Sequence, residues 1–441
     1  MFACGGIRDD GFPANFSPSA ENLSGHRVLL EGMQVLDRFL RYVVIDTQSD
    51  PTSPTQPSTA KQLDLGRLLV QELRELGLPD AELDPHGYVY ATVPATPGHE
   101  AAPVICFCAH MDTSPDASGT GVKPIVHRNY EGGEIALPLG NRVVLRPEEF
   151  AGLRENTGHT VITASGDTLL GADNKAGVAA IVAAVEYLQR HPEIPHGKLR
   201  ILFTPDEEIG RGVNEVDLDK LGADFGYTID GETRGSIEDE TFSADGATIT
   251  IAGVSAHPGF ALGKLENAVK IAADIVAALP RYGLSPETTD GRDGFLHPVS
   301  MTAKAESARI DFILRDFDTE QLADHAAVLE AIIRDVAPRY PNSFIHLEVQ
   351  EQYRNMKEII DRHPRILELA EAAIREVGLE PRKAHIRGGT DGSRLSFMGL
   401  PCPNLFAGEH AFHSPYEWAS EYEMQKAAEV IVAISRRNVE A

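Results

Sequence analysis

Histidine, aspartate and glutamate residues recur directly after short apolar stretches, in positions where their side chains could hold metal ions. Five segments share this design: VICFCAHMDTSPD (104–116), TLLGADNKAG (168–177), LRILFTPDEEIG (199–210), FGYTIDGE (225–232) and NLFAGEHAFHSP (404–415). Imidazole nitrogens and carboxylate oxygens are ligands that zinc accepts, whereas the sequence shows no four-sulfur structural site. Two divalent ions about 3.5–4 Å apart can polarise a carbonyl group and activate a water molecule. The segments therefore indicate metal-assisted hydrolysis.

The residue types in these segments match what a two-metal hydrolase requires. Such an enzyme uses about three protein ligands per ion, one carboxylate shared between the ions and a further carboxylate as general base. The candidates, one or two per segment, are His110, Asp173, Glu207, Glu208, Asp230 and His413.

Each segment also has a plain structural interpretation when it is taken alone. A His and an Asp two residues apart occur by chance in many loops, and adjacent glutamates are more often part of a solvated turn. Asp173 could cap a helix, Asp230 could belong to a turn, and His413 could be structural. Five such endings in one chain are hard to explain by coincidence, so the metal interpretation is preferred.

The elements that carry these residues alternate between strands and helices. The apolar runs predict strands at 104–109, 199–204 and 227–229, and helices are expected at 176–190 and 365–377. This alternation predicts an α/β fold with a mostly parallel sheet and helices on both faces. Ligands gather at the carboxyl ends of strands in such sheets, so segments far apart in sequence can surround one point.

The pattern changes between residues 242 and 353, where strand, helix, strand, helix and strand follow one another. We expect this part to form an inserted α+β lid domain, and residues 28–241 and 354–441 to form the catalytic domain. Residues 1–27 are rich in Gly, Asn, Ser and Pro and have no period. They predict a disordered arm, or a start codon placed too far upstream.

Composition excludes several classes of protein. The 441 residues include 40 Lys and Arg against 66 Asp and Glu, a formal charge of −26, which argues against a nucleic-acid or anionic-membrane partner. Four cysteines make no disulfide framework for so long a chain, and Cys106 and Cys108 fit small apolar residues in a buried strand. With neither a membrane span nor a secretory signal expected, a cytoplasmic location is predicted.

At these motifs the sequence resembles a known family. AHMDTSPD, TLLGADNKAG, FTPDEEIGRG, YTIDGE and IRGGTDGSRLSFMGLPCPNLF resemble the signature segments of the peptidase T branch of the co-catalytic zinc exopeptidases, which include carboxypeptidase G and aminoacylase. The likeness runs in order from about Met33 to the C-terminus. It implies an aminopeptidase that releases the N-terminal residue from short peptides, tripeptides in particular. It also implies two Zn²⁺ per subunit, with Co²⁺ or Mn²⁺ as substitutes.

The resemblance also implies a role for each site residue. The five metal ligands would be His110 and Asp230 for one ion, Glu208 and His413 for the other, and Asp173 bridging both. Glu207 would be the general base, Asp112 would orient His110, and the peptide bond after Asp173 would be cis.

Two positions depart from the family pattern. Asn174 stands where peptidase T often has a second Asp, although Asn also occurs there in the wider family. The segment GEHAFHSPYEW differs between Gly408 and Glu417 and contains both His410 and His413. The spacing to Glu417 favours His413 as the ligand.

Four residues are candidates for contact with the substrate. His257, in SAHPG, resembles a family histidine that would donate to the developing oxyanion, a contact worth about 3 kcal/mol; alternatively it is a turn histidine before Pro258. Arg387, in IRGGTDG, would bind the carboxylate of the peptide. Asn355 and Arg315 are weaker candidates, and Arg315 could instead pair with the nearby aspartates.

Alternatives remain within and outside this class. The same metal site would serve a dipeptidase, a carboxypeptidase or a deacylase, and an inactive binding protein could keep the fold. The resemblance further allows a homodimer formed through the inserted domain.

Overall fold

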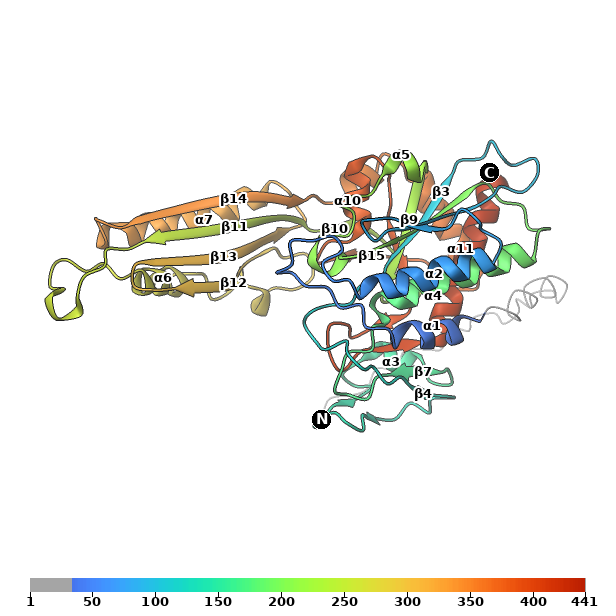
Figure 1. Cartoon of the computed structure of the whole chain (residues 1–441), viewed down its shortest axis with the longest axis horizontal. Helices are drawn as coiled ribbons and strands as arrows, with labels where there is room; N and C mark the ends of the chain where they lie inside the picture. The colour runs from blue at the N-terminus through green and yellow to red at the C-terminus, as the bar shows by residue number, and fades with distance from the viewer. Residues whose placement is uncertain (1–33, 441) are drawn as a thin grey trace, which may run out of the picture. The chain divides into compact units, whose positions relative to one another are not determined.

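The computed structural model describes residues 34–440, so the predicted N-terminal arm at 1–27 lies outside the described residues. Its largest sheet has eight strands in the order β1-β2-β8-β3-β9-β16-β10-β15 (Figure 1). In that order they are Glu82–Leu83, Val89–Val93, Leu199–Thr204, Ile105–His110, Phe225–Gly231, Asn404–Phe406, Ser236–Thr241 and Arg382–Ile386. The pairs β3–β8, β3–β9, β9–β16 and β10–β15 are parallel, so the predicted mostly parallel sheet is confirmed.

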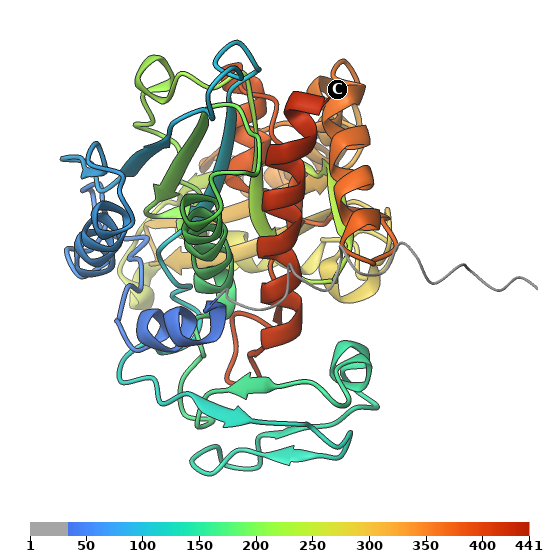
Figure 2. The same cartoon turned by 90° about the vertical axis from the view of Figure 1, so that its right-hand side faces the viewer.

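Helices cover both faces of this sheet, as predicted. On one face α4 (Ala172–Arg190) packs on β3 and β9, and α1 (Val35–Val43) and α11 (Glu421–Glu440) pack on α4. Figure 2 shows α4 in green beside α11 in red. The remaining helices of this part are α2 (Gln62–Glu75), α3 (Ala151–Glu155), α5 (Leu218–Leu221), α8 (Lys357–Ile360), α9 (Pro364–Glu376) and α10 (Asp391–Met398).

The alternation of side chains along β3 explains its two apolar faces. Cys106 and Cys108 point to one face, where they join a buried cluster with Leu221 of α5 and Leu395 of α10. The prediction that these cysteines act as small buried apolar residues is confirmed.

One glycine sets the distance between α4 and the sheet. A Cβ atom at Gly177 would lie 1.9 Å from the carbonyl oxygen of Ile229, so only glycine fits there without displacing the helix. Ile229 precedes Asp230 in β9, and Asp173 lies at the start of α4. The close approach therefore brings two of the predicted metal ligands toward each other.

A second sheet, which the sequence patterns did not predict, holds both ends of the loop between β17 and β18, the loop that carries His413. Its order is β17-β18-β7-β4, formed by Glu409–His410, Trp418–Ser420, Val161–Thr163 and Ile125–His127. A separate pair joins β5 (Ile135–Ala136) to β6 (Val144–Leu145). These strands have two or three residues each, too few to produce a detectable alternation.

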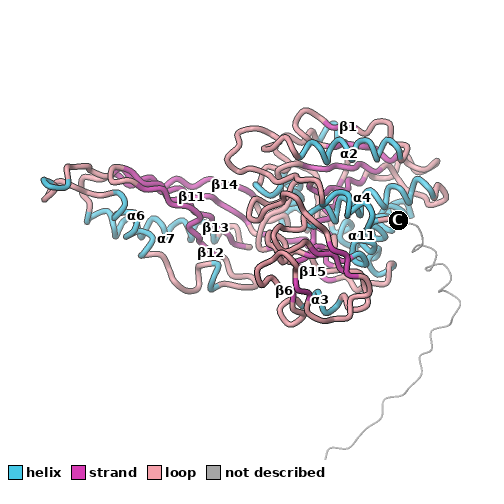
Figure 3. Tube along the Cα trace, turned by 60° about the horizontal axis from the view of Figure 1, so that its bottom comes forward, coloured by secondary structure: helices cyan, strands magenta, loops and turns pink. Residues whose placement is uncertain are grey.

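Residues 243–353 contain a four-stranded antiparallel sheet in the order β12-β13-β11-β14 (Figure 3). Its strands are Phe295–Ala303, Ser307–Asp316, Ser243–Ala252 and Phe344–Tyr353. The helices α6 (Ala268–Ala277) and α7 (Gln321–Val336) bury their apolar side chains against it. The sequence reading omitted β12, because Pro298 and the polar residues after it break the pattern. Proline is tolerated in β12 since this strand lies at the edge of the sheet.

No helix among residues 34–440 has an apolar stretch long enough to cross a membrane.

Candidate active site

The five predicted segments meet at one pocket of about 590 Å³. It lies where β3, β8 and β9 end, as expected for a parallel sheet. The six predicted metal and base residues all line it: His110, Asp173, Glu207, Glu208, Asp230 and His413. Three further glutamates that are not among the sequence candidates, Glu232, Glu238 and Glu409, line it as well.

Asp173 lies between two histidines. Its Oδ1 is 2.8 Å from Nε2 of His110, and its Oδ2 is 3.2 Å from Nε2 of His413. Nε2 of His413 is also 2.7 Å from Oε2 of Glu208, and Nε2 of His110 is 3.4 Å from Oδ1 of Asp230. Each oxygen of Asp173 thus faces a different set of partners, which is the arrangement of a bridging carboxylate.

The unpaired atoms of the cluster fit divalent cations. Two groups, His110–Asp173–Glu208 and Asp173–Asp230–Glu409, each place their ligand atoms within 4.8 Å of one another. Oε1 of Glu208, Oδ1 of Asp230 and Oε2 of Glu409 are buried and have no hydrogen-bond partner among residues 34–440. Buried carboxylate oxygens without partners are costly, and cations would satisfy them. The residues therefore fit a pair of metal positions that share Asp173.

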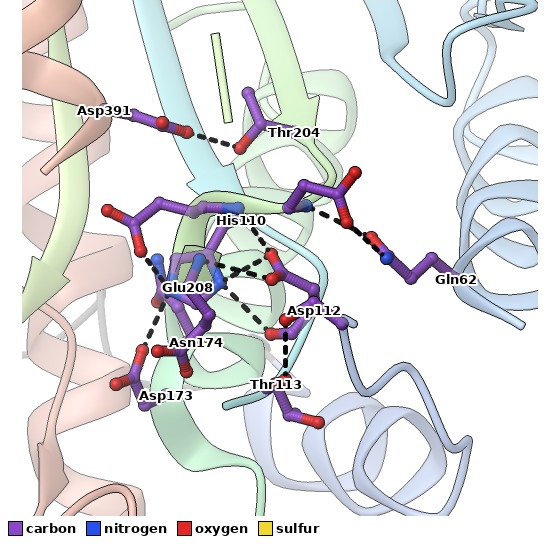
Figure 4. Close-up of polar contacts among 12 residues, drawn as sticks. Gln62, His110, Asp112, Thr113, Asp173, Asn174, Thr204, Glu208 and Asp391 are labelled. Atoms are coloured by element: carbon purple, nitrogen blue, oxygen red, sulfur yellow. Dashed lines mark hydrogen bonds and ion pairs between the residues drawn. The ribbon is translucent and has the colours of Figure 1, made fainter. Parts of the chain in front are cut away.

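The carboxylate of Asp112 organises the turn that carries both glutamates. It accepts hydrogen bonds from the backbone N–H of Glu207 at 3.0 Å and of Glu208 at 3.2 Å. Its Oδ1 is 3.4 Å from Nδ1 of His110, which is also 3.1 Å from the carbonyl oxygen of Asp112. Figure 4 shows His110, Asp112, Asp173 and Glu208 grouped around this turn. Asp112 therefore holds the 207–208 backbone as well as contacting the histidine.

Asp206 fixes the same turn from the other side. It adopts a left-handed conformation with φ 58°, and its buried carboxylate accepts hydrogen bonds from Ser58 N at 2.6 Å and Gln62 Nε2 at 2.6 Å. Its own N–H donates to Oε1 of Gln62 at 3.1 Å. Gln62 is labelled in Figure 4. The sequence analysis does not predict this anchor, because Ser58 and Gln62 lie more than 140 positions away from Asp206 in the chain.

Glu417 fixes the segment that leads into α4. Its carboxylate accepts hydrogen bonds from the N–H groups of Leu170 at 2.6 Å, Gly171 at 2.8 Å and Asp173 at 3.0 Å. The peptide bond between Asp173 and Asn174 is cis, as the family resemblance implies. In the sequence Glu417 serves only to favour His413 through its spacing, and nothing in the local pattern indicates a carboxylate that binds backbone N–H groups.

Burial, together with charge interactions inside the cluster, shifts the pKa values of its side chains. Burial raises the pKa of Glu208 to about 8, and Asp173 adds to the effect. Burial also raises the pKa of Glu207 well above its usual value, although His110 opposes the shift. For His413 burial acts downward, but Asp173 and Glu208 prevail and raise its pKa to about 11. Positive charge from bound cations would relieve this repulsion.

The structure distinguishes the two histidines of the 408–417 loop. His413 faces Asp173 and Glu208, whereas His410 is buried with its ring stacked on Trp418 at 3.9 Å between centroids. Nε2 of His410 is 2.7 Å from Oε2 of Glu423. His410 thus faces away from the metal cluster, and His413 faces into it.

Two of the predicted substrate contacts are engaged elsewhere. His257 is exposed before the short turn Pro258–Phe260, where its Nδ1 accepts a hydrogen bond from Gly259 N at 3.2 Å. It is absent from the pocket lining. Arg387 does line the pocket, but its Nη1 donates to the carbonyl oxygens of Gly291 and Asp293, both at 2.8 Å.

The weaker candidates lie outside the pocket lining. Asn355 is buried, and its Oδ1 accepts hydrogen bonds from the N–H groups of Thr241 at 3.2 Å and Lys357 at 3.0 Å. Arg315 donates to the carbonyl oxygen of Asp245 at 3.2 Å, and its guanidinium lies 5.5 Å from the centre of the Tyr353 ring. Neither side chain contacts the metal cluster, and both hold backbone segments in place.

An α/β sheet whose strand ends bring together His, Asp and Glu side chains that could hold metal ions is typical of metal-dependent hydrolases. Residues 167–437 match the family model for peptidase family M20/M25/M40, and the chain belongs to this family of peptide hydrolases. Peptidase T of Geobacillus kaustophilus is 48% identical over 401 residues, which cover 91% of this chain and 97% of that relative.

Solved structures share the fold. A tripeptidase from Staphylococcus aureus has a TM-score of 0.72 at 22% identity, over 93% of this chain and 100% of that chain. A dinuclear metal-binding peptidase of the M20 family from Bacillus subtilis has a TM-score of 0.61 at 14% identity, over 94% and 99% of the two chains.

Proposed function

We propose that this peptide hydrolase is an aminopeptidase that releases the N-terminal residue from short peptides, tripeptides in particular, with two zinc ions. The observation that carries the proposal is Asp173, whose two carboxylate oxygens face His110 and His413. The substrate class is supported by the 48% identity to a peptidase T along nearly its whole length.

The ligands divide between the two metal positions. His110 and Asp230 would hold one ion, Glu208 and His413 would hold the other, and Asp173 would be shared. Nitrogen and carboxylate oxygen ligands suit zinc, and Co²⁺ or Mn²⁺ would substitute. When bound, the two ions would polarise the scissile carbonyl group and lower the pKa of a water molecule.

Glu207 is the residue that moves the proton. Its Oε2 lies in the pocket, 4.0 Å from Nε2 of His110. No positively charged side chain among the described residues forms a closer ion pair with Glu207. It accepts a proton from the attacking water as the oxygen bonds to the carbonyl carbon. It then donates this proton to the leaving nitrogen when the C–N bond breaks. Asp112 keeps Glu207 in place through its backbone N–H.

The two parts of the chain would have different tasks. Residues 28–241 and 354–441 would form the catalytic domain, and residues 242–353 would form a lid that closes over the peptide. Closure would carry the exposed His257 toward the scissile carbonyl. Arg387 lines the pocket and would bind the carboxylate of the peptide on exchanging a carbonyl partner for it.

The setting we propose is the cytoplasm, because the three cysteines among the described residues are buried and unpaired. A homodimer through the inserted domain is supported by exposed apolar side chains on its sheet, such as Met301 and Phe344. Sedimentation of the full chain would test this assembly.

A panel of peptides tests the function. Di-, tri- and tetrapeptides, free and N-acetylated, are incubated with the protein after addition of zinc, cobalt or manganese. We expect free tripeptides to lose their first residue fastest, and N-acetylated peptides to resist cleavage. Release of C-terminal residues from the blocked peptides would overturn the aminopeptidase proposal.

A further inference from the structure

Glu409 belongs to the metal cluster but is neither a ligand nor the base in the proposed function. It is 1% exposed, lines the pocket, and places a ligand atom within 4.8 Å of those of Asp173 and Asp230. Its Oε2 is buried and has no hydrogen-bond partner in the described part of the chain. No Lys or Arg in that part forms an ion pair with it.

The backbone delivers this side chain to the cluster. The N–H of Ala407 donates to the carbonyl oxygen of Gly231 at 2.7 Å, which holds the end of β16 beside the residue after Asp230. In β17 Glu409 and His410 point to opposite sides, as successive strand residues do. His410 points to Glu423 and Trp418, so Glu409 points into the pocket. The position is therefore built into the strand pairing.

We propose that Glu409 is an additional ligand of the metal position formed by His110, Asp173 and Asp230. The inference rests on the proposed two-metal function and adds a third carboxylate to one of its two positions. The other position keeps Glu208, His413 and the shared Asp173.

The extra oxygen ligand changes which ions this position prefers. Structural and catalytic zinc sites are usually four-coordinate, whereas manganese favours more oxygen ligands. A position with three carboxylates and one imidazole therefore binds Mn²⁺ better, relative to Zn²⁺, than one with two carboxylates. Glu409 thus makes the two positions of the centre unequal in their metal preference.

The test measures metal binding directly, without reference to turnover. Full-length wild type and Glu409→Gln are stripped with a chelator, and Mn²⁺ and Zn²⁺ binding is titrated by calorimetry or chelator competition. We expect Glu409→Gln to lose at least about tenfold in affinity for one of the two ions, with a larger loss for Mn²⁺ than for Zn²⁺. Glutamine keeps the shape of a protonated glutamate but cannot supply a negatively charged oxygen to a metal ion. Unchanged affinity for both ions would therefore show that Glu409 is not a ligand, and it would overturn the proposal.

A matched control is available in the same pocket. Glu238 is a pocket carboxylate whose Oε2 accepts a hydrogen bond from Asn404 Nδ2 at 2.6 Å, and it belongs to neither metal group. Glu238→Gln is expected to bind both ions within about twofold of wild type; a tenfold loss there would overturn the specific assignment to Glu409.

Thermal unfolding separates misfolding from loss of a ligand. Metal-free Glu409→Gln should unfold at or above the wild-type temperature, because a charge is removed from a crowded acidic cluster. It should gain less stability than wild type when metal is added. A lower unfolding temperature without metal would indicate a structural role and overturn the proposal.

If the wild type binds two ions and cleaves peptides while Glu409→Gln binds them equally well, only this inference fails. If the wild type binds no ions, the proposed function fails with it.

Discussion

At the scale of single residues, the division between ligands and base can be tested at two adjacent glutamates. Glu207→Gln removes the proton acceptor but no proposed ligand, so it should keep both metal ions and lose at least about 100-fold in kcat. Glu208→Gln removes a ligand and should lower the metal content. Peptide hydrolysis and elemental analysis of both variants provide the measurement, and wild-type turnover in Glu207→Gln would contradict the assignment.

Glu417 supports a second prediction at this scale. Its carboxylate accepts three backbone N–H groups of the segment that carries Asp173. Glutamine offers one acceptor oxygen in place of two and introduces an N–H₂ group that faces those donors. Glu417→Gln should therefore lose about 1–3 kcal/mol of stability and bind metal more weakly.

Urea denaturation without metal and metal titration measure the two effects. Glu421→Gln makes the same chemical change at the start of α11 and serves as the control. Equal loss in both variants would show that the contacts of Glu417 have no special part in holding Asp173.

The sequence indicates the proposed metal ligands more directly than the residues that hold them in place. His110, Asp173, Glu208, Asp230 and His413 follow apolar runs, and this periodicity places them at strand and helix ends where they meet. Asp206 and Glu417 bind backbone N–H groups of segments far away in the chain. Such contacts depend on the tertiary fold, so they leave no local pattern that sequence reasoning can detect.

At the scale of elements, the packing of α4 against β9 depends on Gly177. A methyl group there would lie 1.9 Å from the carbonyl oxygen of Ile229, so Gly177→Ala should push the helix away from the strand. We expect a loss of about 1–3 kcal/mol in the free energy of unfolding, with weaker metal binding because Asp173 and Asp230 move apart. Gly133→Ala is the control, since nothing lies within 4 Å of its added Cβ. Unchanged stability in Gly177→Ala would contradict this account of the packing.

Elements with strong periods were predicted and short or interrupted ones were not. The strand at 199–204 and the long helix ending at Arg190 match the structure closely, because their apolar residues repeat over many positions. The edge strand β12 was missed because Pro298 interrupts it. The sheet containing β17 and β18 was missed because its strands are too short to show alternation. Glu409 lies in β17, so its place in the pocket escaped prediction with the strand itself.

At the scale of the whole molecule, buried groups with raised pKa values govern how stability depends on pH. Burial is the largest cause for the acids, and it raises the pKa of Glu238, Asp391 and Glu417 to about 7. His410 has a pKa of about 9, because Glu423 and Glu232 outweigh the effect of burial. In every case the folded state holds its proton to a higher pH than the unfolded state does.

The sign of the pH dependence follows from this proton balance. Between the ordinary carboxyl pKa of about 4.3 and pH 9, these four groups bind more protons in the folded metal-free protein than in the unfolded chain, so their contribution to stability falls as pH rises. The acids add their penalty as pH rises from about 4.3 to 7. The contribution of His410 is complete below about 6.5 and is lost as pH rises toward 9.

The measurement is urea denaturation of chelator-treated protein at several pH values between 5 and 9. The wild type should become less stable across this range. Glu238→Gln cannot ionise, so its stability should fall less between pH 5 and 7, by about 1–3 kcal/mol. Addition of metal should oppose the trend, because the ligands must be deprotonated to bind and affinity therefore grows with pH. If the stability of the metal-free wild type instead rose from pH 5 to 8, the prediction would be wrong. These buried groups would then give up their protons as readily in the folded state as in the unfolded chain.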